Sequence, residues 1–175
     1  MSHPAGLPDL FIDRSLGRIQ VPHILRAAGL RLTTLAERYG IPADETVSDV
    51  TWLSEAGRRG EAVFMKDARV RYNPAEKQAV QEYRVKAFCL ARQSLTATAM
   101  AQLFLDNIEA ITTACQGRNE GLFVVTNAGL RRVALSGRSF ALSGSSAGVP
   151  GGGPSHIRWG PSASRMLPGS VVARA

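Results

Sequence analysis

The chain has 175 residues, of which 45% are hydrophobic, and it carries a formal net charge of +7. This length and apolar content suit one domain with a core of its own. No apolar stretch reaches membrane-spanning length and no basic segment followed by an apolar run opens the chain, so we expect a cytoplasmic protein without a membrane partner. The positive charge favours an anionic partner, either nucleic acid or an acidic protein segment.

Cysteine and histidine give no sign of a zinc site. Cys89 and Cys115 each lack a neighbouring cysteine, and the three histidines lie far apart in the sequence. We therefore expect two buried, reduced thiols. The sequence also contains no P-loop and no GxGxxG motif that opens a helix after a strand, so these nucleotide-binding signatures are absent.

The composition of the chain changes near Ser136. Residues 136–175 are about half Gly, Ser and Pro, and they contain four arginines but no Asp, Glu or Lys. Such a segment cannot bury enough apolar surface to offset the entropy that it would lose on ordering. We predict one domain over residues 8–135, followed by a disordered basic tail over residues 136–175.

Within residues 8–135, short apolar runs alternate with stretches of helical periodicity. The predicted strands are residues 9–12, 31–35, 62–65, 85–90 and 122–126. The predicted helices are residues 22–28, 49–56, 74–83 and 96–111. The spacing of Thr46 and Asp49 is that of a capping box at the start of the second helix. This alternation predicts an α/β fold with a parallel or mostly parallel sheet under helices.

Three aspartates lie where these elements end or begin. Asp13 follows the first strand, Asp67 follows the third strand after one lysine, and Asp49 opens the helix between them. Side chains at the carboxyl ends of strands in an open α/β sheet meet in one crevice. Carboxylates gathered there repel one another unless a cation lies between them, and Mg²⁺ prefers oxygen ligands. The pattern indicates metal-dependent phosphodiester chemistry.

Two of these acids also have structural alternatives. Asp13 could cap its own turn or pair with Arg14, and Asp49 could return the hydrogen bond of the capping box. Asp44 and Glu45 are close enough in the sequence to take the place of Asp49. The sequence alone does not decide between these structural roles and a role in binding a metal ion.

Asp67 is the strongest of the three candidates, because it lies alone among cations directly after a strand. The cations that we expect to dock an RNA backbone are Lys66, Arg69, Arg71, Arg58 and Arg59. Arginine forks grip phosphate oxygens, although a solvated basic surface would have the same composition. Trp52 and Tyr72 could stack on bases, but Trp52 lies on a helix beside Leu53 and is the more typical core residue.

Three stretches resemble motifs of the PIN-like domain family, in its branch of VapC-type toxins. They are the Phe-Ile-Asp-Arg-Ser-Leu-Gly run of residues 11–17, the helix of residues 49–60 that ends in Ala-Gly-Arg-Arg-Gly, and the Lys-Asp to Pro-Ala-Glu stretch of residues 65–76. The resemblance covers about residues 9–133. It implies a three-layer α/β/α fold with a mostly parallel central sheet.

The same resemblance implies a function. It implies a Mg²⁺- or Mn²⁺-dependent ribonuclease whose catalytic and metal-binding residues are Asp13, Asp49 and Asp67, with RNA as substrate and an antitoxin protein as partner. A homodimer is a further expected assembly.

The sequence departs from the family pattern at one place. Many PIN domains carry a fourth acid after a later strand, where this chain has Ala91-Arg92-Gln93. A catalytically weak or inactive PIN-like module that binds RNA or a protein partner therefore stays open. A response-regulator-like receiver would need an acidic pair after the first strand, where this chain has Asp13-Arg14.

Overall fold

The computed structural model describes residues 2–66, 70, 72–92, 94–118 and 120–135. The chain divides into two units, Met1–Ser139 and Phe140–Ala175, and the described residues all belong to the first. The predicted tail over residues 136–175 lies outside the described residues, so its disorder stays a prediction.

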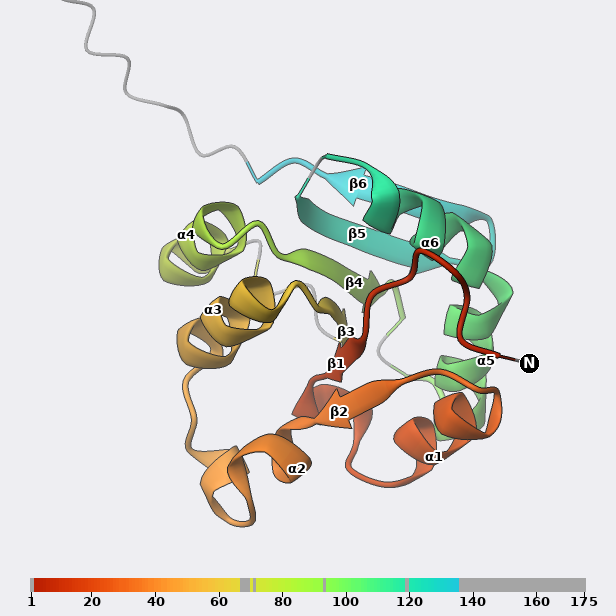
Figure 1. Ribbon diagram of the computed structural model, residues 1–175, viewed down its shortest axis with the longest axis horizontal. Coiled ribbons are helices and arrows are strands. Elements are labelled where there is room, and N and C mark those ends of the chain that lie inside the picture. The colour runs from red at the N-terminus through yellow and green to blue at the C-terminus, as the bar shows by residue number, and fades with distance from the viewer. Residues whose placement is uncertain (1, 67–69, 71, 93, 119, 136–175) are drawn as a thin grey trace, which may run out of the picture. The chain divides into compact units, whose positions relative to one another are not determined.

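A six-stranded sheet forms the centre of the described part (Figure 1). The strands are β1 (Leu10–Ile12), β2 (Leu32–Thr34), β3 (Ala62–Met65), β4 (Lys86–Leu90), β5 (Gly121–Thr126) and β6 (Gly129–Val133). Their order is β2-β1-β3-β4-β5-β6; β1 to β5 are parallel, and β6 runs antiparallel to β5. The mostly parallel α/β sheet is confirmed. The strand β6 was missed, because two exposed arginines, Arg131 and Arg132, interrupt its apolar pattern.

Helices cover both faces of the sheet and give the three layers that were predicted (Figure 1). One face carries α1 (Gln20–Ala27), α5 (Ala97–Asp106) and α6 (Ile108–Gln116). The other carries α2 (Leu35–Tyr39), α3 (Asp49–Arg59) and α4 (Pro74–Glu82). Two 3-10 turns, η1 (Arg14–Leu16) and η2 (Ala43–Glu45), complete the order. None of the described helices is long and apolar enough to cross a membrane.

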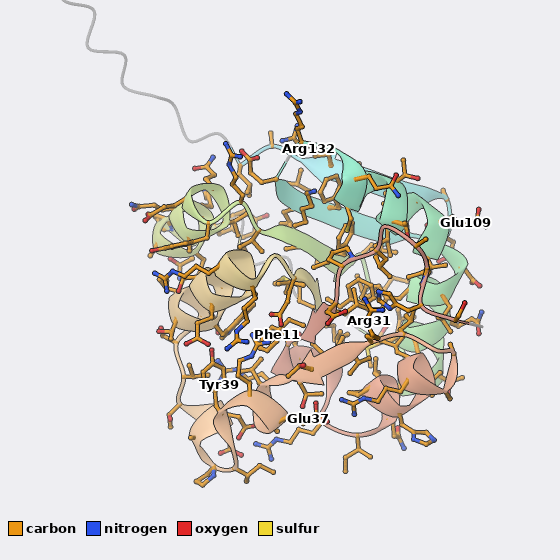
Figure 2. All side chains as sticks on the ribbon, viewed as in Figure 1. Phe11, Arg31, Glu37, Tyr39, Glu109 and Arg132 are labelled. Carbon is orange, nitrogen blue, oxygen red and sulfur yellow. The ribbon has the colours of Figure 1, made fainter. Side chains whose placement is uncertain are left out.

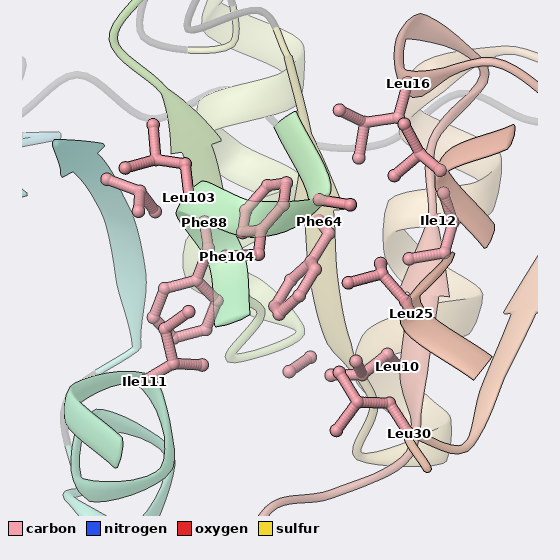
Figure 3. Packing of buried hydrophobic residues seen from close by; sticks show 14 of the residues in the cluster. Leu10, Ile12, Leu16, Leu25, Leu30, Phe64, Phe88, Leu103, Phe104 and Ile111 are labelled. Carbon is pink, nitrogen blue, oxygen red and sulfur yellow. The ribbon is translucent and has the colours of Figure 1, made fainter. Parts of the chain in front are cut away.

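Successive residues of each strand point to opposite faces and fill two cores. Phe64 of β3 packs toward α5, where its ring stacks on Phe104 with centroids 4.2 Å apart (Figure 3). Phe11 of β1 packs toward α3, whereas Glu109 and Arg132 stand on the surface (Figure 2). Because both faces are covered, the inner parallel strands β1, β3, β4 and β5 are nearly continuous apolar runs in the sequence, whereas the edge strand β2 is Leu-Thr-Thr. Cys89 and Cys115 are buried, as predicted, and no disulfide joins them.

The single helix predicted over residues 96–111 is wrong: the structure has two helices, α5 and α6. Asn107 ends the first and begins the second. Its side-chain amide donates to the carbonyl oxygen of Leu103 at 2.8 Å and to that of Thr126 at 3.2 Å. An asparagine on a helical periodicity is thus used to break the helix and to tie the break to the end of β5.

The predicted capping box at Thr46 is also wrong. Ser48 caps α3, and its hydroxyl oxygen accepts the backbone N–H of Thr51 at 3.2 Å, while Thr46 ends the turn η2. A capping box does occur earlier, where Thr34 and Glu37 start α2 and stop the predicted second strand short of residue 35. The carboxylate of Asp49 is therefore not occupied in a cap.

Candidate active site

The strand order places a crevice beside β1. The chain passes from β1 to β2 on one side and then returns to β3 on the other side of β1. Ligands of open α/β sheets bind outside the carboxyl ends of the strands at such a switch point. Asp13 directly follows β1 and Lys66 directly follows β3, so both lie at this point.

A cleft of about 280 Å³ opens at this edge, on the side of α3 and α4. It is lined by Asp13, Arg14, Ser15, Asp49, Trp52, Met65, Val70 and Glu76. The structure thus brings two of the three predicted acids, Asp13 and Asp49, into one cleft. The third, Asp67, lies outside the described residues, as do Arg69 and Arg71.

Asp13 is held by the turn that it starts. Its Oδ2 accepts the backbone N–H of Ser15 at 3.2 Å and also the Ser15 hydroxyl. Asp13 is buried, with only 8% of the residue's surface exposed. Burial raises the pKa of Asp13; the Ser15 hydrogen bonds oppose this shift and the nearby Asp49 carboxylate adds to it. The turn cap considered from the sequence is present, and Arg14 pairs with Asp49 instead of Asp13.

Ser15 ties the ends of β1 and β3 together. Its hydroxyl donates to Asp13 and accepts the backbone N–H of Lys66 at 2.9 Å. The backbone N–H of Asp13 in turn donates to the carbonyl oxygen of Phe64 at 3.0 Å. These bonds fix the position of Lys66, the residue before Asp67 in the sequence, relative to Asp13. Nothing local in the sequence reveals this role, because the partner lies in another strand.

Asp49 stands on the first turn of α3 and faces the cleft. Its Oδ1 accepts one hydrogen bond from Arg14 Nη2 and another from Trp52 Nε1, each at 2.9 Å. The side chain is 42% exposed, so Asp49 is the more solvated of the two acids. Trp52 is buried in the core and also orients a cleft carboxylate, whereas Tyr72, the other aromatic considered for base stacking, is exposed.

The two acids considered as substitutes for Asp49 pair with another residue and are not among the residues that line the cleft. Arg18 pairs with Asp44 at 2.9 Å and with Glu45 at 2.7 Å. A different acid, Glu76, lines the cleft and was missed as a site residue. Its place was foreseeable, because the first turn of a helix that follows a parallel strand lies near the carboxyl edge of the sheet.

The donor set of the cleft fits a hard divalent cation in part. Oδ1 of Asp13 and Oδ2 of Asp49 accept no hydrogen bond from the described residues. Carboxylate oxygens are the donors that Mg²⁺ and Mn²⁺ take. No three His, Cys, Asp or Glu side chains of the described residues are placed to hold a metal ion. The described residues of the cleft therefore offer at most two carboxylates to one ion.

The three described cations of the predicted RNA-docking set lie in two different regions. Lys66 lies at the cleft edge, but Arg58 and Arg59 end α3, about 15 Å along the helix from Asp49 at 1.5 Å per residue. The Arg58 guanidinium lies 4.7 Å from the centre of the Tyr83 ring. Gly57 permits this packing, since a Cβ there would lie 2.4 Å from the Tyr83 carbonyl oxygen. Arg58 and Arg59 are close to Asp67 in the sequence, so their distance from the cleft could not be seen there.

Comparison with known proteins agrees with the α/β fold. A family model described as "PIN like domain" matches residues 8–92. The chain is 38% identical over 122 residues to "Putative ribonuclease VapC45" of Mycobacterium tuberculosis (strain ATCC 25618 / H37Rv), and the match covers 70% of this chain and 87% of that protein. No solved structure matches the chain significantly. The fold and site define an α/β protein with acids at the switch point of its sheet. The chain belongs to the PIN-like domain family.

Proposed function

We propose that this chain is a metal-dependent endoribonuclease and the toxin of a VapBC-type toxin–antitoxin pair. The observation that carries the proposal is the meeting of Asp13 and Asp49 in one cleft at the carboxyl ends of β1 and β3. The relative named as a ribonuclease supports RNA as the substrate.

Asp13, Asp49 and Asp67 would together hold Mg²⁺ or Mn²⁺. When bound, such an ion lowers the pKa of water and stabilises charge on a leaving oxygen. Asp13 is prepositioned for a cation by Ser15, and its burial near the Asp49 carboxylate makes the charged form of Asp13 costly in the absence of a cation. Asp67 would supply a third carboxylate, since in the sequence it directly follows Lys66, whose backbone N–H donates to the Ser15 hydroxyl.

Two sets of cations would contact the RNA at different distances from the cleaved bond. Lys66, Arg69 and Arg71 would dock the phosphates beside the cleft. Arg58 and Arg59 would reach only RNA that extends past it, because they stand at the far end of α3. We expect the double replacement Arg58→Ala and Arg59→Ala to weaken binding of long RNA and to leave cleavage of a short oligonucleotide within about twofold. Each lost phosphate contact also lowers the salt dependence of binding by about one unit of slope. Equal losses on long and short RNA would contradict this division.

The proposed protein partner is an antitoxin, whose acidic or neutral segments would complement the net charge of +7. The two cysteines are buried and form no disulfide, which suits a reducing compartment and supports a cytoplasmic location. A homodimer stays a prediction, and the mass of the purified chain in solution tests it.

A second candidate is a PIN-like module that binds RNA or a protein partner and cuts weakly or not at all. It is favoured by the absence of an acid at residues 91–93. Incubation of the full chain with a structured RNA pool separates the two. The ribonuclease cuts the pool in Mg²⁺ or Mn²⁺ and is silent with chelator, whereas the module retains RNA intact under every condition.

A further inference from the structure

Arg14 makes four hydrogen bonds at the border of the cleft. Its Nη1 donates to the carbonyl oxygens of Asp44 at 3.3 Å and Glu45 at 2.7 Å. Its Nη2 donates to the carbonyl oxygen of Val47 at 2.9 Å and to Oδ1 of Asp49 at 2.9 Å. One side chain thus holds three backbone carbonyls and one of the acids of the cleft.

This use of the guanidinium argues against a direct role on RNA. An arginine has five N–H donors, and a phosphate is gripped through a pair of them in fork geometry. Both terminal nitrogens of Arg14 are occupied by protein acceptors, and only the Nε–H makes no hydrogen bond with the described residues. Arg14 is therefore a clamp on the protein itself.

We propose that Arg14 is a positioning residue that fixes the Asp49 carboxylate for the metal ion; this inference rests on the proposed function. The clamp joins the turn after β1 to the connection between η2 and α3, across 30 to 35 positions of sequence. It holds Oδ1 of Asp49 between Arg14 and the Trp52 indole, which leaves Oδ2 as the oxygen offered to a ligand.

Lysine cannot replace this clamp. An ammonium group keeps the positive charge beside Asp49, but it is a compact point charge and lacks the planar fork that reaches four acceptors at once. The replacement Arg14→Lys therefore separates the geometry of the clamp from its charge.

Arg18 provides a matched control. It ties the same two segments together through Asp44, at 2.9 and 3.1 Å, and through Glu45 at 2.7 Å. In the described part of the chain, Arg18 makes no hydrogen bond or ion pair with Asp13 or Asp49. We expect Arg18→Lys to loosen the connection between these two segments to a similar degree. The contacts of Asp13 and Asp49 should stay unchanged.

The clamp is tested without metal by the Trp52 indole N–H resonance in a ¹H–¹⁵N spectrum of the full chain, assigned with Trp52→Phe. We expect Arg14→Lys to shift this resonance, because the indole shares Oδ1 of Asp49 with Arg14, and Arg18→Lys to leave it in place. An unchanged resonance in Arg14→Lys overturns the proposal, whether or not the chain cuts RNA.

The metal role is tested by calorimetric titration of the same RNA-free proteins with Mn²⁺. Arg14→Lys is expected to bind Mn²⁺ at least about tenfold more weakly, as when a group that orients a metal ligand is lost. Arg18→Lys should stay within about twofold of wild type. Equal affinities of Arg14→Lys and wild type, or equal losses in both variants, overturn the positioning role. A wild-type chain that binds no Mn²⁺ contradicts the proposed function and the metal role together, while the indole result still decides the clamp.

Discussion

Replacing Asp13 by asparagine is expected to abolish RNA cleavage and, at neutral pH, to raise the melting temperature of the protein. Asparagine keeps the size of the side chain, and its amide oxygen can accept both Ser15 hydrogen bonds. It cannot attract a cation by charge. We expect the cleavage rate to fall by at least about a hundredfold, the range seen when one group that stabilises transition-state charge is removed.

The gain in stability follows from the raised pKa of Asp13. Burial makes the charged form less favourable in the folded chain than in the unfolded chain. The stability that the neutral acid contributes is fully present below the unfolded pKa of about 3.9 and is lost as the pH rises through the higher folded pKa. Asparagine stays neutral throughout, so the advantage of Asp13→Asn over wild type should be present at neutral pH and shrink on acidification.

Thermal unfolding across this pH range, together with cleavage assays, checks both halves of the result. Glu82→Gln is the control, because Glu82 is an exposed acid at the end of α4, away from the cleft. An Asp13→Asn protein that still cuts RNA contradicts the assigned role. One that melts below wild type at neutral pH contradicts the cost assigned to the buried carboxylate.

The fold was predictable because its signals are local. The four inner parallel strands, covered on both faces, require nearly continuous apolar runs, and those runs are visible in the sequence. The break at Asn107 was not visible, because its amide is held by Thr126, a residue on β5. The amphipathic pattern runs through Asn107 without interruption, as it would in one continuous helix.

The site was predictable to the extent that topology alone decides it. Asp13 ends β1 and Asp49 begins α3, and any open α/β sheet of this order brings those two ends to one edge. The functions of Ser15 and Arg14 were hidden, since their partners lie 51 and 30 to 35 positions away. Arg58 and Arg59 are near Asp67 in the sequence, but they end α3, at the opposite end of that helix from Asp49, so their distance from the cleft was not visible.

Asp67→Asn is the second replacement with a large expected effect. Asp13 and Asp49 supply two carboxylates, and the described residues contain no three such groups placed to hold a metal ion. If Asp67 is the third, its loss removes the ion and cleavage should fall by at least about a hundredfold. The melting temperature in chelator, where no ion is bound, is expected to stay at the wild-type value.

The measurement that tests the central claim most directly is cleavage of one end-labelled structured RNA pool by wild type and Asp67→Asn side by side. Each protein is assayed in chelator and then after addition of excess Mn²⁺. We predict that wild type cuts only after Mn²⁺ is added and that Asp67→Asn leaves the RNA intact in both conditions. Cleavage by Asp67→Asn at the wild-type rate, or cleavage by wild type in chelator, would contradict a metal-dependent ribonuclease site built on these three acids.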